Sequence, residues 1–320
     1  MTACRTLLCL LLSAVPAAAQ TSPPPLPADR ERTLALAADR LNAGRVEDAE
    51  RLLRSAGDRF QSVEALLQLA RLQSRRGDAP GALESLRKAR TIAPNSEDVL
   101  SALAQVSLAA HAPLPAIASV EALTRLCPSV AQYHYLLGVA LMQIGDMSMA
   151  VDALEAAERL EPDHTLTLVA LGLALNNRKL YAEARPFLLR SLDLNPDSTE
   201  AIAALAESEE GLGDLQSAEA HARRALARPG ATSGANLVLG LLFMKKQQYE
   251  QARDAFTKVV EADPDSSKAH YQLSLACARL GDDACAQKHV DLYKQKLREI
   301  DERVRQLRMQ TGLAATESRP

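Results

Sequence analysis

Residues 131–164 read AQYHYLLGVALMQIGDMSMAVDALEAAERLEPDH, and residues 165–198 read TLTLVALGLALNNRKLYAEARPFLLRSLDLNPDS. The two segments align without a gap, with Gly at the eighth position, Ala at the twentieth and Pro at the thirty-second. The alanine recurs along the chain at one interval of 33 residues and six of 34. Its copies are Ala49, Ala82, Ala116, Ala150, Ala184, Ala218, Ala252 and Ala286. A fixed period in this range predicts stacked supersecondary units instead of one closed domain.

Each unit has the pattern of two short helices. The eighth position is always small, and it lies in the first helix, whereas the alanine at position 20 lies in the second. Small side chains at both positions let the two backbones approach closely, and a larger residue would overpack the contact. In four units the helices are separated by Gly-Asp, at 77–78, 145–146, 213–214 and 281–282. We expect the glycine to end the first helix in a left-handed conformation and the aspartate to cap the second.

This pattern resembles the tetratricopeptide repeat from about Arg30 to Ile300. The resemblance implies an all-α fold, an α-α superhelix of about eight helix-turn-helix repeats with a C-terminal capping helix. The expected repeats are 30–62, 63–96, 97–130, 131–164, 165–198, 199–232, 233–266 and 267–300. Two departures stand out. Trp is absent from the fourth position of every unit, and residues 111–115 (HAPLP) replace the Gly-Asp turn of unit 97–130, which we interpret as an irregular turn.

The N-terminus has the pattern of an export signal. Arg5 precedes an apolar run, Leu7 to Val15, and small residues follow, so residues 1–19 are predicted to be a signal peptide cleaved near Ala19. The run is too short for a transmembrane span. An uncleaved anchor or a buried helix is the alternative. The Pro-rich stretch 20–29 is expected to be an extended linker, and the mature protein to be periplasmic or secreted.

Composition and motifs favour a protein without enzymatic activity. The net charge is −3 with no long basic run, which argues against nucleic-acid binding. No Gly-rich phosphate loop, nucleophile elbow or paired acid motif is present, so no catalytic residue, cofactor or metal is predicted. Trp is absent and aromatic residues are 3%, which counts against a carbohydrate-binding surface.

The resemblance implies that the first helices line a concave groove that binds a protein or peptide partner. Transferred position by position, the candidate groove residues are Arg71, Arg75, Gln105, Tyr135, Val139, Met142, Leu166, Val169, Leu173, Asn176, Glu207, Glu210, Leu241, Met244 and Tyr271. The groove is therefore expected to be basic at 71–75, apolar from 135 to 173 and acidic at 207–210. Alternatively, these residues pack against neighbouring helices or against the chain's own N-terminal segment.

Three cysteines remain after the predicted cleavage: Cys127, Cys277 and Cys285. Cys277 and Cys285 lie four residues before and after Gly281, so a helix hairpin can bring them together as a disulfide if their α-carbons are close enough. Two reduced packing cysteines, or a metal site with His289, are the alternatives. Cys127 is expected to be a packed thiol.

The end of the chain is predicted to be one long helix, 284–309, followed by a disordered tail, 310–320. Its many charged residues are typical of a solubilising cap. Its apolar stripe also suits a homodimer contact; the stripe is Val290, Tyr293, Leu297, Ile300, Val304 and Leu307. The chain is thus interpreted as an exported scaffold or adaptor. The alternative is a non-catalytic specificity subunit of an envelope enzyme or of a pilus, secretion or outer-membrane assembly complex.

Overall fold

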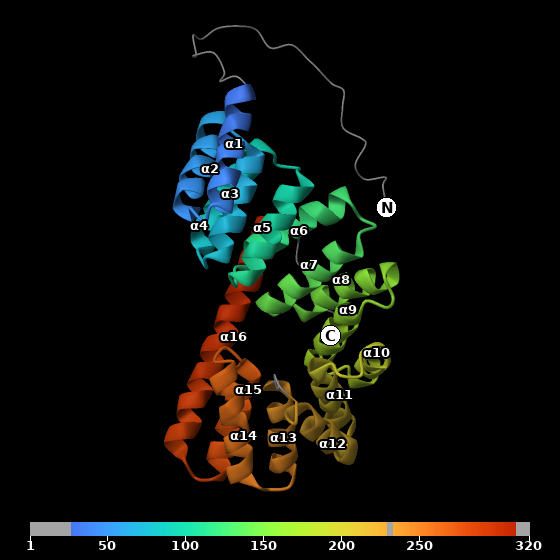
Figure 1. Ribbon diagram of the computed structural model, residues 1–320. Coiled ribbons are helices and arrows are strands. Elements are labelled where there is room, and N and C mark those ends of the chain that lie inside the picture. The colour runs from blue at the N-terminus through green and yellow to red at the C-terminus, as the bar shows by residue number, and fades with distance from the viewer. Residues whose placement is uncertain (1–26, 229–232, 312–320) are drawn as a thin grey trace. The chain divides into compact units, whose positions relative to one another are not determined.

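A computed structural model describes residues 27–228 and 233–311 (Figure 1). These residues form sixteen α-helices and no strand, and within each of two compact units every helix packs against the next one along the chain. The chain divides into two compact units, Met1–Ser129 and Val130–Pro320. The all-α prediction is confirmed. The predicted signal peptide, most of the predicted linker and most of the predicted tail lie outside the described residues.

The first unit contains three helix hairpins. Its helices are α1 (Pro27–Asn42), α2 (Val46–Phe60), α3 (Val63–Arg75), α4 (Ala79–Ile92), α5 (Glu97–Ala109) and α6 (Pro113–Leu126). Helix α1 begins at Pro27, three residues before the expected start of the repeats at residue 30. Proline is tolerated there because the first turn of a helix leaves its N–H groups without partners within the helix.

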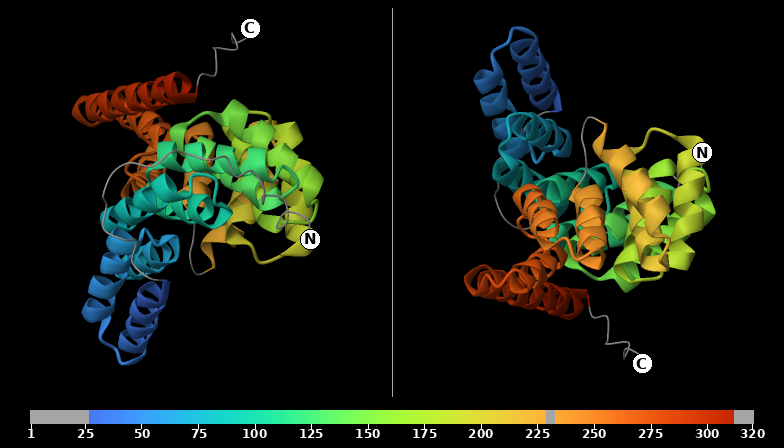
Figure 2. Two further views of the ribbon diagram at one scale, coloured as in Figure 1. Left: turned by 90° about the horizontal axis from the view of Figure 1, so that it is seen from above. Right: turned by 90° about the horizontal axis from the view of Figure 1, so that it is seen from below.

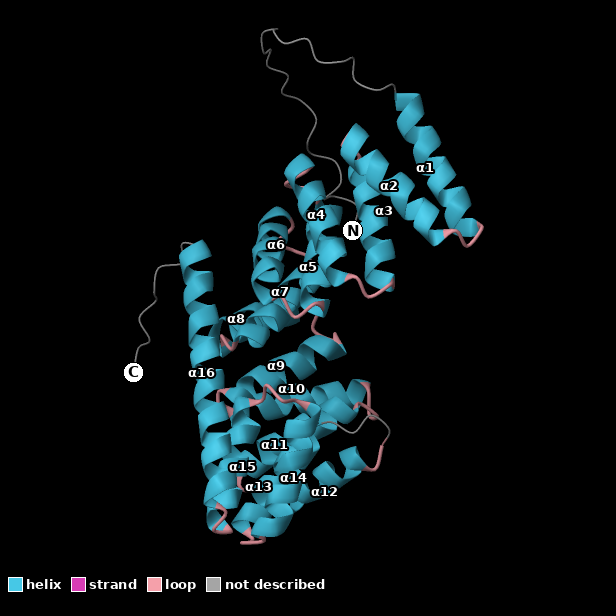
Figure 3. Cartoon of the chain, turned by 90° about the vertical axis from the view of Figure 1, so that its left-hand side faces the viewer, coloured by secondary structure: helices cyan, strands magenta, loops and turns pink. Residues whose placement is uncertain are grey.

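The second unit contains the other ten helices, which follow one another as a superhelix (Figure 2). They are α7 (Ala131–Ile144), α8 (Met147–Leu160), α9 (Thr165–Asn177), α10 (Tyr181–Leu194), α11 (Thr199–Leu212), α12 (Leu215–Leu226), α13 (Ser233–Lys245), α14 (Tyr249–Ala262), α15 (Ser267–Arg279) and α16 (Asp283–Thr311). Helix α16 extends beyond α15 as one uninterrupted helix (Figure 3).

The turns within the hairpins have the predicted chemistry. Gly145 ends α7 at a φ of 85°, in the left-handed region, and the Asp146 carboxylate accepts a hydrogen bond from the Met149 amide at 3.2 Å. The other three Gly-Asp pairs repeat this geometry. The irregular turn of unit 97–130 is also present: His111 adopts a φ of 51°, and both flanking helices form.

The repeated small residues mark the closest helix contacts. Seven of the eight period alanines are fully buried, and only Ala286, in the last hairpin, is partly exposed. At the eighth position, a Cβ added to Gly138 or Gly172 would collide with the leucine of the facing helix. Leu36 is 40% exposed although its counterparts in the later repeats are more buried, because no repeat precedes it among the described residues.

Candidate partner-binding site

The concave side of the first unit carries a cavity of about 320 Å³ between α3 and α5. Arg71 and Arg75 lie on its α3 wall, and Gln105 lies on its α5 wall. All three side chains are exposed. Its floor is apolar and includes Leu67 and Val106. The structure therefore brings the three predicted residues of this unit together around one cavity.

The concave side of the second unit carries an apolar cavity of about 350 Å³ across α7 and α9. Six predicted groove residues line it: Tyr135, Val139, Met142, Leu166, Val169 and Leu173. Leu166 is 53% exposed, an unusually open position for a large apolar side chain. Burial, and then the nearby Glu200 carboxylate, raises the pKa of Tyr135, so its hydroxyl stays protonated at the rim.

The position-by-position transfer missed two carboxylates at these cavities. Asp98 lines the cavity of the first unit, and Glu200 lines that of the second. Both occupy the second position of their repeats, as Leu166 does. The repeat register was therefore a sufficient signal to find them.

The acidic segment 207–210 does not form an open acidic groove. Glu207, Glu209 and Glu210 are buried, and each is paired with a side chain of the same protein. Lys245 Nζ lies 2.6 Å from the Glu210 carboxylate, and His221 Nδ1 lies 2.7 Å from that of Glu209. Glu207 is paired with Lys268, 61 residues away in the sequence. The expectation of a free acidic surface is wrong because superhelical packing brings later helices onto it.

Asn176 also lies inside the protein instead of in the groove. It is 1% exposed, and its side-chain amide donates to the Ala204 carbonyl at 2.8 Å. Its carbonyl oxygen accepts a hydrogen bond from the Ser208 hydroxyl at 2.7 Å. These two bonds join α9 to α11, so Asn176 stabilises the stacking of two repeats.

The last predicted groove residues face other parts of their own chain. Leu241 and Met244 are partly buried against the apolar cluster around Phe256. Tyr271 is 41% exposed, and its ring lies 5.2 Å from that of Tyr293 on α16. Helix α16 thus covers part of the surface that was predicted for a partner.

Helix α16 packs within its own unit along most of its length. Near its start, His289 lies against His270 of α15, with the two Nδ1 atoms 2.9 Å apart. Further along, Lys296 Nζ lies 2.6 Å from the Asp265 carboxylate. Ile300 then reaches Gly145 at the end of α7. These contacts agree with the interpretation of a helix that packs on the array. The side chain of Leu307, in the predicted apolar stripe, lies outside the described residues.

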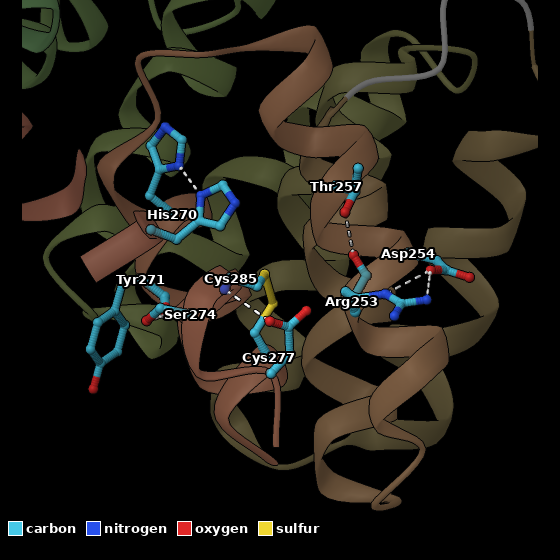
Figure 4. Close-up of a disulfide and its surroundings, with 10 residues drawn as sticks. Arg253, Asp254, Thr257, His270, Tyr271, Ser274, Cys277 and Cys285 are labelled. Carbon is cyan, nitrogen blue, oxygen red and sulfur yellow. Dashed lines mark hydrogen bonds and ion pairs between the residues drawn. A yellow bond between two sulfur atoms is a disulfide. The ribbon is translucent and has the colours of Figure 1, made fainter. Parts of the chain in front are cut away.

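A disulfide joins Cys277 of α15 to Cys285 of α16 (Figure 4). The Cα–Cα distance is 5.8 Å, which meets the geometric requirement stated from the sequence. The metal alternative is wrong in this structure because the two sulfur atoms bond each other and His289 contacts His270 instead. Cys127 is buried, with its sulfur 3.9 Å from the Glu97 carboxylate.

Comparison with known proteins gives the same fold class. A profile described as tetratricopeptide repeat matches residues 34–97, 102–164, 145–199 and 237–286, together more than half of the chain. The chain therefore belongs to the tetratricopeptide repeat family. Proteins built from these repeats are generally non-catalytic scaffolds that bind protein partners. A search of curated proteins found no match.

Two solved structures support the fold. One is a tetratricopeptide repeat protein from Parabacteroides merdae, 16% identical, with a TM-score of 0.62, over 78% of this chain and 99% of that one. The other is the Cut9-Hcn1 hetero-tetramer of APC/C, also 16% identical, with a TM-score of 0.56, over 77% of this chain and 52% of that one. At this identity the likeness concerns the fold alone. None of the described helices is long and apolar enough to cross a membrane.

Proposed function

We propose that this protein is an exported, non-enzymatic scaffold that binds a protein or peptide partner on the concave side of its repeats. The observation that carries the proposal is the apolar cavity of about 350 Å³ with Leu166 half exposed on its wall. Exposed apolar surface of this kind is typical of a binding site when it lies in a groove.

Site-specific photo-cross-linking tests the proposal. A photoreactive residue replaces Leu166 on α9 or, as a matched control, Leu189 on α10, which is also an exposed leucine but lies outside the cavity. We expect a discrete cross-linked partner in cells from position 166 and none from position 189. Equal cross-linking at both positions, or none at either, would contradict a binding site on the concave side. A catalytic chain as the captured partner would identify a specificity subunit.

Export is part of the proposal and has its own readout. The sequence pattern of residues 1–19 supports it. Cell fractionation and N-terminal sequencing of the mature protein are expected to place it in the envelope or the medium, beginning at Gln20. A full-length chain in the cytoplasmic fraction would contradict export while leaving partner binding untouched. A role of the C-terminal helix in homodimerisation would require cross-links that join two copies of the protein through this helix.

A further inference from the structure

We propose that the cavity between α3 and α5 binds an extended acidic segment of the partner, in which two carboxylates flank one apolar residue. The carboxylates pair with Arg71 and Arg75, and the apolar side chain faces the α5 wall. The inference rests on the proposed function, because it specifies which chemical groups of the partner bind to one part of the same concave surface.

The first argument is the missing counter-charge. Among the described residues, no ion pair joins Arg71 or Arg75 to an acidic group, whereas the nearby Arg54 and Arg76 both pair with Glu50, at 3.0 and 2.9 Å. The residues outside the described ranges contain a single acidic side chain, Glu317. The N-terminal segment before α1 contains none, so it cannot neutralise the two arginines. A partner's carboxylates are the complementary ligand, since guanidinium groups favour carboxylates in bidentate geometry.

The second argument is spacing. Arg71 and Arg75 are four residues apart on one helix, so they lie on the same face and are separated by a rise of about 6 Å. In an extended peptide, residues i and i+2 point to the same side and lie about 6.6 Å apart. The two spacings match, whereas adjacent acidic residues of an extended chain would point in opposite directions.

The third argument is the composition of the opposite wall. With both carboxylates directed at α3, the intervening side chain points towards α5, where Ala102 and Val106 offer apolar surface. Ser101 and Gln105 beside them can hydrogen-bond the free backbone groups of an extended peptide, which a helical ligand would not present. Asp98 on the same wall repels a third carboxylate, so it selects the order acidic-apolar-acidic.

Two fluorescein-labelled peptides test the inference: Gly-Ser-Glu-Leu-Glu-Ser-Gly and its isomer Gly-Ser-Glu-Glu-Leu-Ser-Gly. They have the same composition and charge and differ only in the spacing of the acidic residues. Fluorescence anisotropy measures their binding to the whole protein at about 50 mM salt, where screening is weak. We expect the alternating isomer to bind about fivefold more tightly, and its affinity to fall as salt is raised.

Matched variants locate the site. R71E/R75E should weaken the alternating peptide about tenfold or more, because attraction becomes repulsion. R87E makes one substitution of the same kind at an exposed arginine of α4 outside the cavity, and it should leave binding unchanged. D98N should tighten binding about twofold by removing the repelling carboxylate. If circular dichroism shows that R71E/R75E is misfolded, R71Q/R75Q replaces it, with a loss of about fivefold expected.

Equal binding of the two isomers, or unchanged binding to R71E/R75E, would overturn the inference. Photo-cross-linking from Gln105 separates this failure from that of the proposed function. If position 105 captures a partner in cells but the acidic peptide does not bind, the scaffold function stands and the acidic chemistry is wrong. If the partner captured from position 105 carries an acidic-apolar-acidic segment, and mutating that segment abolishes capture, the inference is supported.

Discussion

The concave surfaces of the two units are lined by the same repeat positions, but their charges are satisfied differently. In the first unit, Arg71 and Arg75 face a cavity and form no ion pair among the described residues, although Asp98 lies on the opposite wall. In the second unit, Glu207, Glu209 and Glu210 each have a basic partner supplied by the same chain. One surface is therefore open to an external charge, and the other is largely neutralised from within.

This difference has a physical origin in the number of repeats. The second unit has enough hairpins for its superhelix to bring distant helices together, as the pairing of α15 with α11 through Lys268 and Glu207 shows. The first unit has three hairpins, and the ion pairs seen among its described residues join the same or neighbouring hairpins. A short stack thus leaves its concave charges available, whereas a long stack can pair them internally. The apolar cavity at Leu166 is the part of the second surface that remains open.

The largest expected effect tests whether the two units are separate cooperative structures. Leu86 and Leu154 are both fully buried, one in each unit. Leu86→Ala and Leu154→Ala should each cost about 2–5 kcal/mol of unfolding free energy, because each leaves a cavity in a close-packed layer. Stability in repeat proteins is dominated by nearest-neighbour contacts, so each loss should stay in its own unit. Hydrogen exchange measured by mass spectrometry should show faster exchange in 27–129 for the first variant and in 130–311 for the second.

The control for this pair is Leu189→Ala, at a leucine that is 43% exposed. Its cost should remain within about 0.5 kcal/mol, since surface truncations remove little buried area. Faster exchange throughout the chain in both core variants would show that the two units unfold as one, and the comparison between them would lose its basis.

A smaller effect should distinguish the charges of the two surfaces. Lys268→Met removes the partner of a buried carboxylate, Glu207, and should destabilise the second unit by about 1–2 kcal/mol, a range reduced for the partial exposure of the lysine. Arg75→Met removes a charge that forms no ion pair among the described residues, and should change the stability of the first unit by less than about 0.5 kcal/mol. Urea unfolding followed by circular dichroism measures both.

The double variant Lys268→Met/Glu207→Gln provides the control for that comparison. Because it removes the buried charge together with its partner, it should recover most of the loss. Equal destabilisation by Lys268→Met and Arg75→Met would contradict the distinction between a neutralised and an open surface.

The helix pattern could be predicted from the sequence because it depends on local chemistry. Ala150 and Gly138 indicate a close contact within one hairpin, and Gly145-Asp146 indicates one turn. The sequence of a single repeat is therefore enough to predict its two helices and the turn between them. The cavity-lining residues followed in the same way from their register. The internal pairing of the three glutamates could not be predicted in this way. It depends on the small rotation between successive repeats, which accumulates over several repeats and cannot be inferred from any single position.

Helix α16 illustrates the same limit. Its charge density and apolar stripe predicted a long helix but left two partners open, the array or a second copy. The contact of Ile300 with Gly145 joins residues that are far apart in the sequence. It depends on how the superhelix places α16 relative to α7. Asn176 was misplaced for a related reason: a polar side chain at a groove position indicates exposure unless a neighbouring repeat supplies hydrogen-bond partners, as α11 does here.

The smallest expected effect is a pH dependence that belongs to the second unit. His270 donates from Nε2 to the Pro264 carbonyl at 3.0 Å, so its Nδ1 accepts the hydrogen bond from His289 Nδ1. Burial above all, and then the proximity of His270 and Lys288, lowers the pKa of His289 below its ordinary value of 6.5. The folded unit therefore keeps His289 neutral while the unfolded chain binds a proton as the pH falls through 6.5.

Stability contributed by this histidine is complete above that pH and is lost progressively below it, down to the pKa of the folded state. The first unit contains one histidine, His111, at an irregular turn, and should show no matching loss. Hydrogen exchange at about pH 7 and about pH 5.5, corrected for intrinsic rates, should show a selective weakening around α15 and α16. His289→Gln should flatten this dependence even if it lowers the stability at neutral pH. The same pH dependence in the variant and the wild type would assign the effect to other groups, and α16 would then be held independently of His289.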